Sequence, residues 1–385
     1  MNVDWRFART VAGRVSGQEP FAQSYHVASL EADLFELTSQ AESLVEAETG
    51  LVSAAGPARA RVTDRLGWVD ANLASFERLI RPLLGRINEP AAAGEPGDGG
   101  ARPRPPGWAG TVADTLAPVG RAVNALGDVV GPKVAGAELG ALLGWMSSRV
   151  LGQYDLLIIE DHTAHEQDWV YYVGPNVLSL ERRYGFAPRE FRLWLAVHEC
   201  THRAQFTGVP WLRPYFLSLV NELLDSVDPD PRRVLDALAD TARELGRGNG
   251  PSLRDGGLSV LLASPEQRET MKKVSGLMSL LEGHGDIVMD RATRDLIPSQ
   301  QRFARVMTQR RQNAGGLAKL IQRLTGIEAK LAQYEEGERF VEAVERAGGR
   351  KLFDQVWTGP ESLPTIDEIR DPQLWISRVR TPAGA

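Results

Sequence analysis

Apolar residues recur at intervals of three and four positions along most of the chain, which is the spacing of one face of an α-helix. This pattern predicts helices over 27–45, 58–87 and about 188–208. Runs of β-branched and aromatic residues predict two short strands, Leu156–Glu160 and Trp169–Val173. We therefore expect a mainly α fold of the α+β class, in which many helices surround a small β-sheet.

The apolar run 134–145 contains a repeat of glycine at every fourth position, Gly136, Gly140 and Gly144. The run includes Glu138 and is shorter than the roughly twenty apolar residues needed to cross a bilayer. Glycine at this spacing allows another backbone to approach closely along one face of a helix. The run therefore predicts a buried, closely packed helix.

Composition narrows the classes of partner and the cellular compartment. The 385 residues are 43% apolar, enough for a large core, and the net charge of −6 comes without a long basic tract. We therefore expect no binding to nucleic acid or to a membrane. Cys200 is the only cysteine, which excludes an intrachain disulfide, and the amino terminus lacks the layout of a secretion signal. These features favour the cytoplasm.

Residues 198–202 read His-Glu-Cys-Thr-His, the HExxH pattern. Positions i and i+4 share one face of a helix, so His198 and His202 can bind the same zinc ion while Glu199 lies beside them as a base. Pro188 in the first turn and the stop signal from Gly208 onward put the motif in the second half of its helix. Cys200 should point away from the metal as a small buried residue. The alternative interpretation is a pair of ordinary core or surface histidines.

A catalytic zinc site usually has three protein ligands, so a third ligand is expected elsewhere in the chain. The strongest candidate is Glu282, with Asp286 four positions later. If this segment is helical, one carboxylate can bind zinc and the other can accept the free N–H of a ligating histidine. His284 competes as a third ligand, although it points in a different direction from Glu282. His162 and His165 are further candidates in a polar stretch.

An HExxH helix followed on a later helix by Glu-x-x-x-Asp is similar to the thermolysin-like gluzincins. The resemblance implies His198, His202 and Glu282 as zinc ligands, Glu199 as general base and Asp286 as the residue that orients a ligand. The separation between His202 and Glu282 is far longer than in thermolysin. Several extra helices would therefore have to intervene.

Further segments support a resemblance over nearly the whole chain: Gly152–Leu157, Val173–Asn176, Gln205–Phe206, Pro210–Arg213, Leu281–Asp290 and Gln333–Phe340. In these segments the chain resembles a family of uncharacterised zincin-like proteins. The members of this family are proposed to be zinc-dependent metalloproteases and are associated by name with deazaflavin-coenzyme biosynthesis. The resemblance implies a zincin-like core. We accordingly divide the chain into an N-terminal helical region (1–88), a Pro- and Gly-rich linker or flexible loop (89–108) and a zincin-like metal-binding domain (109–385).

The sequence thus predicts a zinc metallopeptidase, a hydrolase that cleaves a peptide or protein substrate with a zinc-activated water and Glu199 as base. Tyr334 and His284 are weak candidates for an oxyanion donor. The strand at 169–173 is the candidate edge strand for pairing with an extended peptide. The alternative is a catalytically silent zinc-binding scaffold for a peptide or protein partner. The chain has no Gly-rich phosphate loop to support direct action in coenzyme synthesis.

Overall fold

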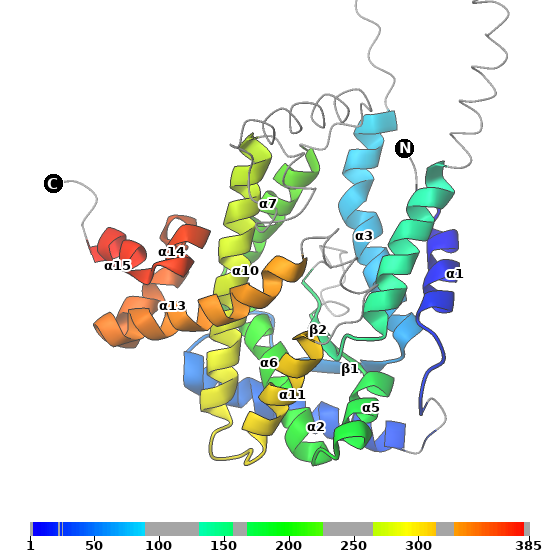
Figure 1. Ribbon diagram of the computed structural model, residues 1–385, viewed down its shortest axis with the longest axis horizontal. Coiled ribbons are helices and arrows are strands. Elements are labelled where there is room, and N and C mark those ends of the chain that lie inside the picture. The colour runs from blue at the N-terminus through cyan, green and yellow to red at the C-terminus, as the bar shows by residue number, and fades with distance from the viewer. Residues whose placement is uncertain are drawn as a thin grey trace, which may run out of the picture. The chain divides into compact units, whose positions relative to one another are not determined.

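The computed structural model describes residues 3–21, 24, 26–88, 131–156, 168–225, 265–312 and 327–380. In these parts the chain is largely helical and contains a three-stranded sheet (Figure 1). The mainly α fold of the α+β class is confirmed. The chain forms two compact units: one comprises Met1–Ser24, Thr63–Leu151 and Val173–Asn176, and the other comprises Tyr25–Val62, Gly152–Tyr172 and Val177–Ala385. The linker at 89–108 lies outside the described residues, and the predicted division around it stays a prediction.

The first unit is built from helix α1 (Trp5–Val15), helix α3 (Arg65–Asn88) and the helical residues 131–147. The glycine repeat lies against α1, as its spacing predicts. A Cβ at Gly136 would lie 2.6 Å from the carbonyl oxygen of Asp4, and a Cβ at Gly140 would clash with that of Ala8. Larger side chains would force these two helices apart.

The predicted helix over 58–87 is wrong in its first turns. Arg59–Thr63 forms strand β1 instead, and α3 begins at Arg65. The side chain of Asp64 accepts a hydrogen bond from the backbone N–H of Gly67 at 2.6 Å, which caps the amino end of α3. Because a capping residue is not itself helical, the helix cannot extend back through Asp64. The apolar residues before Asp64 belong to strand β1.

The sheet of the second unit has the strand order β1-β3-β2, with β2 at Gly152–Tyr154 and β3 at Trp169–Val173. The predicted strand 169–173 is confirmed, but it is the central strand, so its assignment as the edge strand was wrong. Strand β2 pairs antiparallel with it, with Gly152 opposite Tyr172. The other predicted strand began at Leu156, where the structure has none, and 157–160 lie outside the described residues.

The described part of the chain contains further helices. They are α2 (His26–Thr49), α5 (Gly174–Tyr184), α6 (Pro188–Gly208), α7 (Leu212–Asp225), α10 (Pro265–Ala292), α11 (Gln300–Gln312), α13 (Ile327–Phe353), α14 (Ile366–Arg370) and α15 (Pro372–Arg380), with the short 3₁₀ helices η2 (Asp354–Trp357) and η3 (Pro360–Ser362). Helix α6 packs between α2 and α10 and contacts β2, while α10 also packs against α13 (Figure 1). Helices α6 and α10 therefore lie against each other, and α6 also lies against the sheet.

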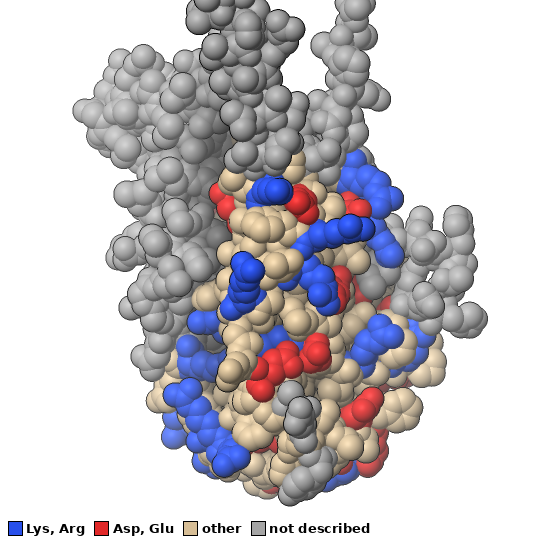
Figure 2. All heavy atoms as spheres, turned by 90° about the vertical axis from the view of Figure 1, so that its right-hand side faces the viewer, with Lys and Arg blue, Asp and Glu red and all other residues tan. Residues whose placement is uncertain are grey.

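Two further properties bear on partners. None of the described helices is both long and apolar enough to cross a membrane. Figure 2 shows Lys and Arg side chains scattered among Asp, Glu and uncharged residues on the face that it draws. The expected lack of nucleic-acid binding stays a prediction.

Candidate metal centre

Helix α6 carries the two histidines of the HExxH motif. It begins with proline at Pro188, where the missing N–H is tolerated, and it ends at Gly208. Most side chains of α6 between Phe191 and Phe206 are buried. The side chains of His198 and His202 stay partly exposed, at 23% and 16%. The predicted helix is confirmed, and its two histidines remain accessible to a small ligand.

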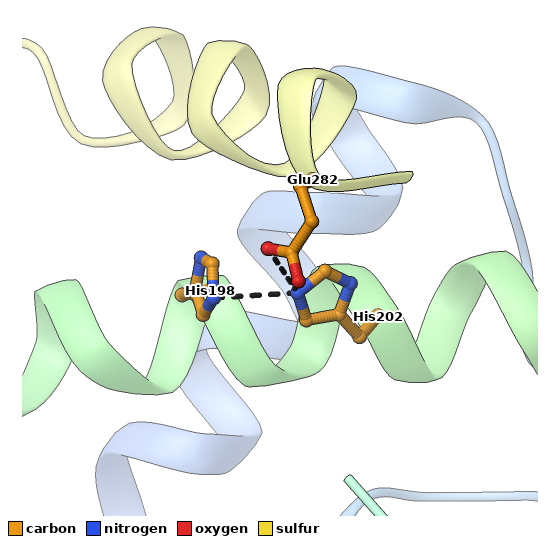
Figure 3. Close-up of side chains that lie close together, drawn as sticks. All are labelled: His198, His202 and Glu282. Atoms are coloured by element: carbon orange, nitrogen blue, oxygen red, sulfur yellow. Dashed lines mark hydrogen bonds and ion pairs between the residues drawn. The ribbon is translucent and has the colours of Figure 1, made fainter. Parts of the chain in front are cut away.

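The imidazoles converge with a carboxylate from α10. The Nε2 atoms of His198 and His202 lie 3.3 Å apart, and the Oε2 atom of Glu282 lies 3.5 Å from the Nε2 atom of His202. One ligand atom from each residue lies within 4.8 Å of the others. Figure 3 shows the three side chains pointing toward one another from α6 and α10. Residues far apart in the sequence therefore form one compact donor cluster that can bind a metal ion.

These separations fit a tetrahedral ion of the size of zinc. Two nitrogens bound at about 2.0–2.1 Å with a tetrahedral angle lie about 3.3–3.4 Å from each other. A nitrogen and a carboxylate oxygen bound at about 2.0–2.2 Å lie about 3.3–3.5 Å apart. The observed 3.3 Å and 3.5 Å match both values. Two imidazoles and one carboxylate are also the donor set of many zinc hydrolases.

The charges of the cluster favour a cation. Burial lowers the pKa of His202, but the carboxylates of Glu282 and Glu199 outweigh this effect and raise the pKa to about 9. The two carboxylates therefore hold a proton on His202 at neutral pH when no metal is bound. Because a metal needs the neutral ring, it has to displace this proton.

Glu199 lies beneath strand β2. A Cβ added at Gly152 would lie 2.6 Å from the Oε1 atom and 2.8 Å from the Cδ atom of Glu199, so only glycine fits at this position of β2. Burial raises the pKa of Glu199 to about 7, with a further rise from Glu282, while His202 and a backbone hydrogen bond from Tyr154 oppose it. Glu199 is thus a carboxyl group that can take up and release a proton near neutral pH.

Gln205 was not predicted as a site residue. Its Oε1 atom lies 3.0 Å from the Nδ1 atom of His202, and its Nε2 atom donates to the carbonyl oxygen of Leu281 at 3.0 Å. The same Nε2 atom lies 2.9 Å from the Nδ1 atom of His284. The spacing of three positions from His202 on one helix was the available signal. Gln205 therefore links the two helices that supply the cluster.

The other predicted residues lie around the cluster. The Oδ1 atom of Asp286 is 4.0 Å from the Nδ1 atom of His198, in ion-pair range but beyond a hydrogen bond. The ring of His284 packs against Phe353 and Trp357, with its centre 5.3 Å from each of their ring centres, and its burial lowers its pKa to about 3. The structure therefore brings Glu282, and not His284, to the two histidines of α6.

For three predicted candidates the structure describes no side chain. His162 and His165 fall in 157–167, and the side chain of Tyr334 falls in the part of α13 whose side chains are not described. Cys200 is described and buried, and its Sγ atom lies 3.6 Å from the carbonyl oxygen of Thr38 in α2. Its thiol therefore contacts α2 and does not belong to the donor cluster, as its position in the motif predicts.

Comparisons with known proteins agree with this geometry. A family described as zincin-like metallopeptidase matches residues 3–376. The chain is also similar to a protein from Chloroflexus aurantiacus whose crystal structure is described as that of a proposed hydrolase with a novel fold. The two chains share 28% identity with a TM-score of 0.66, and the match covers 99% of this chain and 100% of that chain. No curated protein matches.

Proposed function

The chain belongs to the zincin-like metallopeptidase family, and we propose that it hydrolyses peptide bonds at a zinc ion held by His198, His202 and Glu282. The observation that carries this proposal is the spacing of the donor atoms. The distances of 3.3 Å and 3.5 Å match those expected between two donors of a tetrahedral zinc ion. The family match supports a hydrolase, and the similar protein from Chloroflexus aurantiacus is described as a proposed hydrolase as well.

The residues of the chain have separate tasks in this reaction. A zinc ion bound by the cluster would polarise the scissile carbonyl group and make a water molecule more acidic. Glu199 takes a proton from the attacking water at its carboxylate and then delivers it to the leaving amine. Burial of Glu199 raises its pKa and so favours uptake of the proton from water.

Strand β2 offers a place for an extended substrate. Among the described strands it forms an end of the sheet, and its residue Gly152 touches Glu199. An extended peptide can add to such an edge by main-chain hydrogen bonds. A peptide paired with β2 would place its backbone next to the base. This assignment replaces β3, which is internal to the sheet.

The test is a digest of a broad peptide library, read by mass spectrometry. Wild type with one equivalent of zinc should cleave peptides, whereas Glu199→Gln should keep its zinc and lose most turnover because an amide cannot accept the proton. Glu342→Gln is the matched control, because this residue is largely exposed and pairs only weakly with Arg346 at 3.9 Å. It should behave as wild type.

Metal content is measured on the same samples. Elemental analysis should give about one zinc per chain for wild type and Glu199→Gln, and a loss of zinc in His198→Ala and His202→Ala. Full zinc in both histidine variants would exclude the assigned ligands. Loaded wild type that cuts no peptide, while Glu199→Gln retains the same binding partners, would favour the catalytically silent scaffold.

A further inference from the structure

The side-chain amide of Gln205 lies at the junction between α6 and α10. Gln205 is fully buried, and all three of its polar contacts lie within 3.0 Å. They reach a predicted metal ligand on its own helix, a backbone carbonyl of α10 next to Glu282, and the ring of His284. A buried amide with both ends bonded on two helices has one orientation only.

The partner on α10 fixes which end of the amide is which. The carbonyl oxygen of Leu281 can only accept a hydrogen bond, so the group 3.0 Å from it must be the NH₂ of Gln205. The amide oxygen therefore faces the Nδ1 atom of His202 at 3.0 Å. An amide oxygen can only accept, so Nδ1 must carry a hydrogen.

This hydrogen decides which nitrogen of His202 can bind a metal. With a proton on Nδ1, the neutral ring has its lone pair on Nε2. Nε2 is the atom that lies 3.3 Å from the Nε2 atom of His198 and 3.5 Å from Glu282. The contact with Gln205 thus presents the ligating atom toward the cluster.

We propose that Gln205 is a positioning residue that fixes the tautomer of His202 and at the same time ties the helix of Glu282 to α6. This inference rests on the proposed zinc site. One amide controls both the direction of one ligand and the approach of another, because Leu281 immediately precedes Glu282. Orienting partners of this kind change metal affinity by about 10- to 100-fold.

The experiment compares zinc affinities of metal-free proteins by competition with a chelator. Gln205→Met keeps the length of the side chain but removes all three hydrogen bonds, and we expect it to bind zinc about 10- to 100-fold more weakly than wild type. The control is Thr293→Val. The hydroxyl of Thr293 is buried directly after α10 and lies 2.7 Å from the carbonyl oxygen of Met289, remote from the cluster. This control should lose stability but keep its zinc affinity.

A spectroscopic signature separates positioning from a general loss of structure. In zinc-loaded wild type labelled with ¹⁵N histidine, the Nδ1–H of His202 should give a slowly exchanging ring proton signal. Gln205→Met should lose this signal, while Thr293→Val should retain it. If Gln205→Met does not fold, Gln205→Asn replaces it, because its shorter side chain cannot span His202 and Leu281 together.

The outcomes distinguish this inference from the proposed function. Wild type that binds no zinc would overturn both. Wild type that binds zinc, together with a Gln205 variant of equal affinity and an unchanged His202 signal, would overturn the role of Gln205 alone. Equal weakening of zinc binding in Thr293→Val would also overturn it, because the effect would then come from stability.

Discussion

The contact between β2 and the base predicts the effect of one added methyl group. In Gly152→Ala the new Cβ would lie 2.6 Å from Oε1 and 2.8 Å from Cδ of Glu199, whereas non-bonded carbon atoms rest about 3.5–4.0 Å apart. Glu199 has little room to move away, because it is 6% exposed and accepts a backbone hydrogen bond from Tyr154. Either the strand or the carboxylate has to shift.

Two magnitudes follow from this shift. Overpacking a tight interior costs about 1–3 kcal/mol, so Gly152→Ala should lower the free energy of unfolding by that amount in a denaturant titration. Moving a reacting group by about 1 Å costs about 100-fold in rate, so cleavage of a library peptide should slow by a similar factor. Zinc content should stay at the wild-type value, because Gly152 touches no proposed ligand.

A double-mutant cycle identifies the cause. Glu199→Ala removes the atoms that the new Cβ would meet. In that background Gly152→Ala should therefore cost little free energy of unfolding. Gly131→Ala is the control, since a Cβ at this helical position would meet no atom within 4 Å. It should be neutral or stabilising by up to about 1 kcal/mol. Equal losses from Gly152→Ala with and without the Glu199 carboxylate would refute the argument.

Three further predictions concern other parts of the chain. Asp286→Ala should weaken zinc binding by about 10- to 100-fold in a chelator titration, because this carboxylate lies 4.0 Å from His198, and unchanged affinity would remove it from the site. Gly140→Ala should cost about 1–3 kcal/mol in denaturant unfolding, because its Cβ would clash with the backbone of α1. Burial raises the pKa of Glu368, but its hydrogen bonds with Arg378 outweigh this and leave the pKa below its usual 4.5. The contribution of Glu368 to the free energy of unfolding is therefore complete above pH 4.5 and is lost as the pH falls through the lowered pKa. In Glu368→Gln the free energy of unfolding should fall less over this pH range.

The parts of the site that the sequence predicts are those set by local spacing. His198 and His202 share a face because four residues make about one helical turn, and the same rule relates Glu282 to Asp286. The meeting of the two helices required more than spacing. It rested on chemistry, because two imidazoles need a third donor, and α10 supplies it.

Contacts between distant segments were beyond the reach of local patterns. The order of strands in the sheet depends on packing, so β3 was mistaken for an edge, although its residues were correctly predicted. The contact between Gly152 and Glu199 depends on how β2 packs against α6, and residue spacing along the chain does not reveal this packing. Gln205 was visible three positions after His202, but its partner Leu281 lies on another helix. The start of α3 was missed because Asp64 acts as a cap within an apolar pattern that continues past it.

The distance along the chain between the two halves of the donor cluster determines when the cluster can exist during protein synthesis. Ribosomes complete α6 well before α10 emerges, so the nascent chain first presents His198 and His202 alone. The third donor and the bond from Gln205 to Leu281 arrive only when α10 docks. Tight capture of the proposed zinc ion therefore follows folding and adds its binding energy to the finished structure. The fraction of metal-loaded protein in a cell would then report the fraction of protein molecules in which folding is complete.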